Sequence, residues 1–136
     1  MTPPLQPEEQ ARVLIDEQLT QAGWHVCDRQ DIDLVNQYGN AVREVVMDAG
    51  HGRADYLLYV DKRVVGVIEA KPSGTTLSGV QWQSAMYAAG LPEAYRETAV
   101  LKDDRLPFVF EASGTETHYT NGFDPNPRAR KIFNFP

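Results

Sequence analysis

The sequence is poor in cysteine and in long apolar runs, and both shortages restrict the class of protein. The single cysteine, Cys27, cannot form a disulfide within the chain, which is typical of a reducing compartment. No apolar run approaches the about 20 residues that a membrane-spanning helix needs. No basic segment precedes an apolar one at the N-terminus, so a secretory signal is not expected. We therefore expect a cytoplasmic protein without a membrane partner.

Positive charge is also scarce. The chain has 13 lysines and arginines against 19 aspartates and glutamates, a formal net charge of −6. Proteins that coat nucleic acid are basic, because their cations neutralise phosphates, so the net charge argues against this class. DNA binding by this chain alone is expected to be weak. A nuclease is not excluded, since metal ions can bridge acidic side chains to phosphate. The sequence also lacks the Gly-x-x-x-x-Gly-Lys-Ser/Thr loop, and we expect no ATP binding by this chain.

The length and composition predict one globular domain over residues 1–136. An apolar fraction of 42% is sufficient for a sizeable core. Three prolines in residues 1–7 predict a loose N-terminus. Residues 124–136 are expected to form a tail that leads out of the domain.

The order of predicted elements is helix, strands, helix, strands, which is typical of an α/β layer fold with a mixed sheet. Helices are expected at 7–22 and 78–89, and strands at 41–47, 54–60, 64–71, 106–112 and 116–120. Residues 24–27 are interpreted as a bend, 93–105 as a loop, and 128–131 as a short helix.

The hairpin of residues 54–71 carries ionisable side chains at one end. Asp55 opens its first apolar strand, and Glu69 and Lys71 close its second. Because side chains alternate along a strand, Glu69 and Lys71 share one face. A divalent cation would relieve the cost of placing two carboxylates beside an apolar strand.

Whether Asp55 lies on that same face depends on whether the hairpin loop has an even or an odd number of residues. A loop of two residues puts Asp55 opposite Ile68, on the other face. A loop of three residues, Asp61–Arg63, puts Asp55 opposite Glu69, with Cβ atoms about 5 Å apart. We therefore expect the three-residue loop, or one β-bulge that restores the parity.

Asp55 followed by Glu69-Ala70-Lys71 resembles the PD-(D/E)XK nuclease motif, with Ala54 in place of the proline. The longer strings Gly-Arg-Ala-Asp-Tyr at 52–56 and Val-Ile-Glu-Ala-Lys at 67–71 are more specific. They resemble the N-terminal nuclease domain of the restriction (R, motor) subunit of type I restriction–modification enzymes.

Four further stretches agree with that family and extend the resemblance over nearly the whole chain. They are residues 15–24, which end in Ala-Gly-Trp; the QxxxY stretch 83–87; Leu-Pro-Phe-Val-Phe at 106–110; and Asp-Pro-Asn-Pro-Arg at 124–128. The resemblance implies a restriction-endonuclease-like core, which is a central mixed β-sheet of about four to five strands flanked by α-helices.

The resemblance also implies a catalytic site. Asp55 and Glu69 would hold one or two Mg²⁺ ions together with the backbone carbonyl of Ala70. Lys71, with a pKa depressed by its neighbours, would orient or deprotonate the attacking water or stabilise the transition state. Gln83 and Tyr87, four residues apart on one helix face, would contact DNA or couple cleavage to translocation.

Some assignments have an equally simple structural alternative. Glu9 is a candidate for an additional carboxylate from the first helix, with Glu8 and Glu17 left open, but a helix acid is usually on the surface. Arg53 is expected either to contact DNA or to form a salt bridge. The acid–lysine set at the hairpin end also fits a plain ion pair.

Taken together, the sequence predicts a Mg²⁺-dependent DNA endonuclease domain of a type I R subunit that hydrolyses duplex DNA. Its expected partners are duplex DNA, the modification and specificity subunits, and downstream helicase-like domains. Those domains would use ATP and are absent from this chain, which we interpret as an excised domain or a fragment. Two alternatives remain: a catalytically silent nuclease-fold module for DNA binding or subunit docking, and a standalone repair nuclease.

Overall fold

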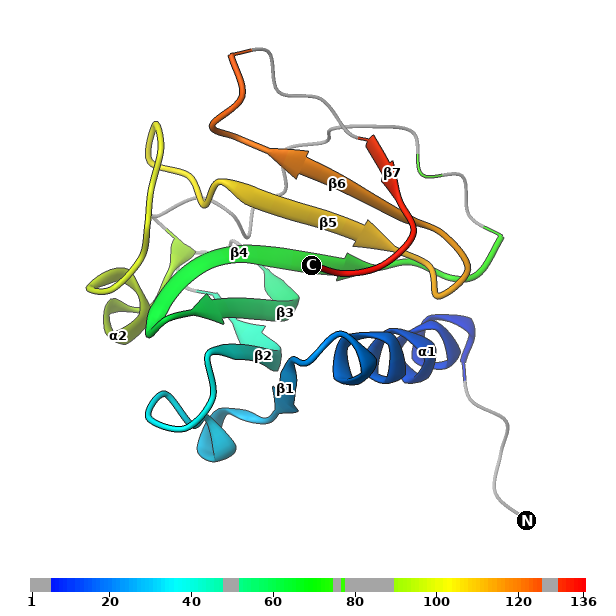
Figure 1. The fold of residues 1–136 in the computed structure, drawn as a ribbon, viewed down its shortest axis with the longest axis horizontal. Helices are drawn as coiled ribbons and strands as arrows, with labels where there is room; N and C mark the ends of the chain where they lie inside the picture. The colour runs from blue at the N-terminus through cyan, green and yellow to red at the C-terminus, as the bar shows by residue number, and fades with distance from the viewer. Residues whose placement is uncertain (1–5, 48–51, 75–76, 78–89, 126–129) are drawn as a thin grey trace.

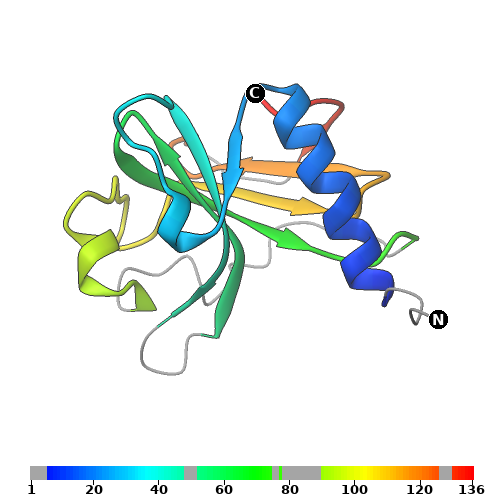
Figure 2. The same cartoon turned by 90° about the horizontal axis from the view of Figure 1, so that it is seen from below.

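A mixed β-sheet with one long helix packed on it forms the framework of the molecule (Figures 1 and 2). The computed structural model describes residues 6–47, 52–74, 77, 90–125 and 130–136. The helices are α1 (Pro7–Gln21), the 3-10 turn η1 (Arg29–Asp31) and α2 (Glu93–Arg96). The strands are β1 (His25–Cys27), β2 (Gly39–Val46), β3 (Arg53–Val60), β4 (Arg63–Ala70), β5 (Phe108–Ala112), β6 (Thr117–Asn121) and β7 (Arg130–Ile132). No helix in this part of the chain is long and apolar enough to span a bilayer.

The sheet is larger than the four to five strands expected from the sequence, which corrects that prediction. The described residues form seven strands in the order β1 to β7; β1–β2 and β4–β5 are parallel and the other pairs antiparallel. The two additional strands are β1, where a bend was expected, and β7, near the expected helix at 128–131. Both have three residues, too few to show a period of two, so they exist through pairing with a neighbour.

Helix α1 covers one face of the sheet. Its residues Ala11, Ile15 and Leu19 repeat every four positions and are fully buried, which is the spacing of one helical face. They pack with alternate residues of the central strands, including Tyr56 and Ile68. The expected helix at 7–22 is therefore confirmed, and it ends where Gly23 takes a left-handed φ of 97°.

The opposite face carries a second apolar cluster. Leu57, Val67 and Val109 from the central strands pack there with Tyr95 of α2. Figure 2 shows α1 and α2 on the two sides of the sheet. The expectation of a loop over 93–105 is corrected by α2, a single turn formed around the buried Tyr95. The helix expected at 78–89, with Gln83 and Tyr87, lies outside the described residues.

The β3–β4 hairpin reaches the expected parity by the second of the two predicted routes. The three-residue loop was wrong: Val60 pairs with Arg63, and Asp61 and Lys62 form a two-residue turn with φ of 48° and 68°. Left-handed φ at both central positions is the geometry of a tight hairpin turn. Tyr59 then pairs with Val64 and Leu58 with Gly66, so one extra residue of β4, Val65, forms a bulge.

Gly66 allows β4 and β5 to lie in parallel register beyond this bulge. A Cβ at this position would lie 2.3 Å from the carbonyl oxygen of Phe108 and 2.9 Å from its Cβ. We expect Gly66→Ala to lower the free energy of unfolding by about 1–3 kcal/mol, measured by urea denaturation. Arg63→Ala, at the exposed start of the same strand, is the control and should change it by less than about 0.5 kcal/mol. Equal stability of Gly66→Ala and wild type would contradict the tight β4–β5 packing.

Candidate active site

Beyond the bulge, Asp55 and Glu69 lie at the same end of the hairpin. Tyr56 pairs with Ile68, which is the last pair of the ladder, and Asp55 and Glu69 each follow one position further out. The Asp55 carboxylate is buried, and its Oδ2 accepts the backbone N–H of Ala70 at 2.9 Å. This hydrogen bond ties the start of β3 to the end of β4. The side chains of both acids therefore lie at the end of the hairpin that is opposite its turn.

Lys71 joins this pair through Glu69. Its Nζ lies 2.7 Å from Glu69 Oε1, and both side chains are about one-third exposed or less. The ion pair foreseen as the plain structural alternative is thus present. The other carboxylate oxygen, Glu69 Oε2, is buried and finds no hydrogen-bond partner among the residues that the structure describes. Buried oxygens without a partner are rare and costly, so Oε2 is a candidate ligand atom for a bound cation.

The electrostatic environment of Asp55 favours a cation. Burial raises the pKa of Asp55 above its ordinary value, and the neighbouring carboxylates of Glu8 and Glu69 raise it further. The Ala70 N–H and the Arg12 guanidinium act in the opposite direction. A divalent cation between Asp55 and Glu69 would remove the like-charge repulsion and the cost of desolvation.

Lys71 differs from its prediction. A depressed pKa was expected, but the hydrogen bond to Glu69 is the largest influence and raises the pKa of Lys71, outweighing the effect of partial burial. Glu111 and Glu8 also raise it. The reason is that three carboxylates surround an ammonium group which is still in contact with solvent. Lys71 is therefore a source of positive charge rather than a base.

The first helix contributes Glu8, rather than Glu9, to the electrostatics of this edge. Glu8 acts on both Asp55 and Lys71. Glu9 instead lines a charged hollow of about 520 Å³ between α1 and strands β2 and β3, together with Arg53. The described residues contain no group of three or more Asp, Glu, His or Cys side chains placed to hold a metal ion. Two carboxylates and a carbonyl still fit Mg²⁺, which keeps several waters.

Glu111 is a neighbour of the site that was not predicted from the sequence. It lies on β5 directly beside Glu69 in the parallel ladder. Burial and Glu69 raise the pKa of Glu111, while Lys71 and His118 lower it. The one signal in the sequence is a carboxylate inside the otherwise apolar run of 106–112. Its partner cannot be read from that run, because parallel strands are far apart in the chain.

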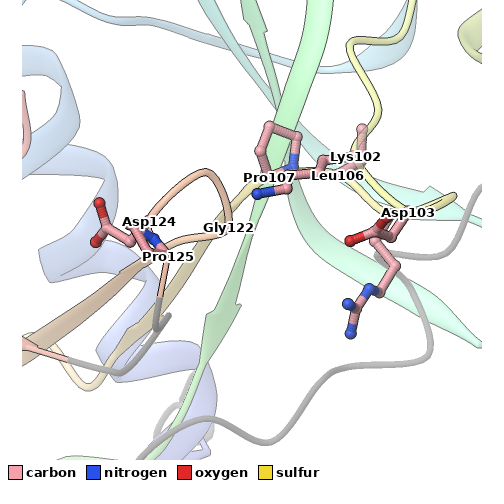
Figure 3. Close-up of a pocket in the computed structure, with 8 residues that line it drawn as sticks. Lys102, Asp103, Leu106, Pro107, Gly122, Asp124 and Pro125 are labelled. Atoms are coloured by element: carbon pink, nitrogen blue, oxygen red, sulfur yellow. The ribbon is translucent and has the colours of Figure 1, made fainter.

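The other hollows do not include the acid–lysine set. Figure 3 shows one of about 220 Å³ between the segment Lys102–Pro107 and the turn Gly122–Pro125, at the start of β5. Glu111 lies toward the opposite end of that strand. A larger hollow of about 560 Å³ is mainly apolar and lies on the α1 face, lined by residues such as Trp24, Leu58 and Phe108. The first is also lined by Asp103, Asp124 and Lys102, but no ion pair of Lys102 with either aspartate is found among the described residues.

Comparison with known proteins gives one family. Residues 35–122, more than half of the chain, match the family model described as the type I restriction enzyme EcoKI endonuclease subunit second domain. The matched segment contains Asp55, Glu69, Lys71 and Glu111, and it excludes α1. That description places the domain second in its subunit, whereas an N-terminal position was expected. No curated protein and no solved structure matches the chain.

The raised pKa of Asp55 predicts a stability effect that depends on pH. Folding raises its pKa above 3.8, so ionised Asp55 costs stability above that pH, and the full cost is present once the pH exceeds the raised value. We expect Asp55→Asn to raise the Tm at pH 7 without divalent cations, with a gain that shrinks toward about pH 4. Asparagine keeps an oxygen for the Ala70 N–H.

Calorimetry over this pH range provides the measurement. Glu97→Gln, which neutralises an exposed carboxylate, is the matched control and should leave the Tm unchanged. A lower Tm for Asp55→Asn than for wild type at pH 7 would show that the ionised carboxylate stabilises the fold.

Proposed function

The chain belongs to the family of the type I restriction enzyme EcoKI endonuclease subunit second domain, and we propose that it is a Mg²⁺-dependent endonuclease domain. The reaction is hydrolysis of phosphodiester bonds in duplex DNA. The family supports a role in a type I restriction enzyme. The reaction, the metal and the PD-(D/E)XK assignment are our inferences from the site.

One observation carries this proposal. Two acids and a lysine lie together at the end of the β3–β4 hairpin, and one buried carboxylate oxygen there has no hydrogen-bond partner among the described residues. Asp55 accepts the N–H of Ala70, the residue next to Glu69, and Glu69 Oε2 has no partner among the described residues. A structural ion pair needs only Glu69 and Lys71. The buried Asp55 beside them adds electrostatic cost, which the Ala70 N–H and the charge of Arg12 oppose without cancelling, since the pKa of Asp55 is still raised. Such an unfavourable arrangement of charge is typical of a functional site, and a reaction that depends on a bound cation would explain it.

In the proposed mechanism Asp55, Glu69 and the Ala70 carbonyl would hold Mg²⁺. When bound, the ion would supply Lewis acidity and a water of lowered pKa. Lys71, which stays protonated at neutral pH, stabilises the negative charge that develops on the phosphoryl oxygens. Without a bound cation, the Glu69 carboxylate holds the Lys71 ammonium at this end of the hairpin.

The DNA duplex is held mostly by other parts of the enzyme in this proposal. The net charge of −6 gives this chain little attraction for phosphate. Arg53 is exposed, lines the charged hollow beside α1, and is our candidate for a DNA contact. Gln83 and Tyr87 stay predictions for contact or coupling. The modification and specificity subunits and the ATP-using helicase-like domains are the proposed partners, in the cytoplasm.

The alternative is a silent nuclease-fold module that docks other subunits. The Lys71–Glu69 ion pair favours it, because that pair satisfies both groups without a metal. Titration of the chain with Mg²⁺ by calorimetry separates the two functions. We expect the wild type to bind and Asp55→Ala to lose binding, because one of two carboxylate ligands is removed. Absent binding, or equal binding by both proteins, would favour the silent module.

Cleavage by the assembled restriction enzyme tests the catalytic roles. We expect Asp55→Ala, Glu69→Ala and Lys71→Ala each to reduce DNA cleavage by about 10²-fold or more, because each removes charge that acts in the transition state. ATP-driven translocation should persist in all three. Lys62→Gln, in the turn at the far end of the hairpin, is the control and should cleave normally. Normal cleavage by the Lys71→Ala enzyme would contradict the role assigned to Lys71.

A further inference from the structure

A row of ionisable side chains continues from the site across the rest of the sheet. In the ladder, Glu69 is paired with Glu111, Glu111 with His118, and His118 with Lys131. Directly paired residues point to the same face of a sheet, and neighbouring strands lie about 4.8 Å apart. These side chains therefore form one line, which begins at the proposed cleavage site and runs toward β7.

Glu111 differs from the other members of this row because its carboxylate forms no hydrogen bond or ion pair with any residue that the structure describes. His118 Nε2 lies 3.2 Å from Glu116 Oε1, and Lys131 Nζ lies 3.8 Å from the same oxygen. Glu69 is paired with Lys71. Within the part of the chain that the structure describes, the Glu111 carboxylate receives no hydrogen bond, although it is only half exposed or less. A partly buried carboxylate beside another carboxylate is costly unless a cation is near.

Lys71 is a cation that can meet this need of the Glu111 carboxylate. It lies two residues beyond Glu69 on the same face of β4. Its backbone N–H donates to the carbonyl of Ala112 at 2.8 Å, which keeps the end of β4 against β5 just past Glu111. The charges of Lys71 and Glu111 already influence each other. The ammonium is thus within reach of two carboxylates and bonded to one of them.

A divalent cation and the Lys71 ammonium would compete for Glu69. Both are positive, and Oε2, which has no partner among the described residues, belongs to the same carboxylate whose Oε1 contacts Lys71. A lysine that loses its partner regains rotamer freedom and moves into solvent. A second carboxylate on the neighbouring strand β5 would keep the Lys71 ammonium at the site.

We propose that Glu111 is a positioning residue, which accepts the Lys71 ammonium when a divalent cation claims the Glu69 carboxylate. This inference rests on the proposed function. The Lys71 ammonium then has two alternative partners on one face of the sheet. It pairs with Glu69 when no divalent cation is bound and with Glu111 when one is bound. In both, its charge stays at the edge where the scissile phosphate would lie.

The position of Lys71 can be followed directly by NMR. The chain has only four lysines, so ¹³C-methylation of their amines, which keeps the charge, gives few signals. The signal of Lys71 is assigned by its loss in Lys71→Arg. On addition of Mg²⁺ we expect the wild-type signal to shift and to stay distinct from that of the exposed Lys62. In Glu111→Gln the same addition should move it to the position of Lys62.

Cleavage by the assembled enzyme gives the second readout. We expect Glu111→Gln to lower kcat by about tenfold, with the KM for DNA and the Kd for Mg²⁺ changed by less than about twofold. Glu111→Asp, which keeps the carboxylate, should recover part of kcat. Glu116→Gln, a carboxylate that holds His118 one strand away, is the matched control and should behave as wild type. Melting curves show that each variant is folded.

The outcomes separate this inference from the proposed function. If the wild type neither binds Mg²⁺ nor cleaves DNA, the proposed function fails and the inference fails with it. If the wild type binds and cleaves while Glu111→Gln retains its kcat and its Lys71 signal, only the role of Glu111 is overturned. A tenfold loss of kcat together with release of Lys71 supports both.

Discussion

One extra residue in β4 decides the arrangement of the whole site. The turn of Asp61 and Lys62 has two residues, and an uninterrupted ladder from such a turn would place Asp55 opposite Ile68, among apolar side chains. The bulge at Val65 shifts every later pair by one position. With this register the Asp55 carboxylate reaches the N–H of Ala70, beside Glu69, and the parallel pairing of β4 with β5 then adds Glu111 next to Glu69. The site is a consequence of strand register more than of any single contact.

The carboxylates at the end of the hairpin lower the stability of the folded chain. Asp55 is buried, its pKa is raised, and the Glu69 Oε2 atom has no partner in the described residues. Lys71 offsets part of this cost through its ion pair with Glu69. The apolar clusters on the two faces, anchored by residues such as Ile15 and Leu57, supply the stability that tolerates it. A polar edge on a rigid apolar sheet is a setting in which a cation-dependent reaction can be preorganised.

Local pattern predicted the parts of the fold that have a clear period. Helix α1 and the central strands follow from apolar spacing, and the β-bulge was one of the two routes that we expected for the hairpin. The turn length was missed because Asp61 and Lys62 take left-handed φ without glycine. Strands β1 and β7 were missed because three residues show no period. Glu111 was missed because its neighbour comes from a parallel strand across a long connection.

The register of β3 against β4 is the most direct test of this account. Cross-strand nuclear Overhauser effects between backbone protons of the isotope-labelled chain report which residues face each other. The account predicts contacts of Tyr59 with Val64 and of Tyr56 with Ile68, which require the bulge at Val65. A continuous ladder, in which Leu58 faces Val65 and Asp55 faces Ile68, would separate the two carboxylates and contradict the account.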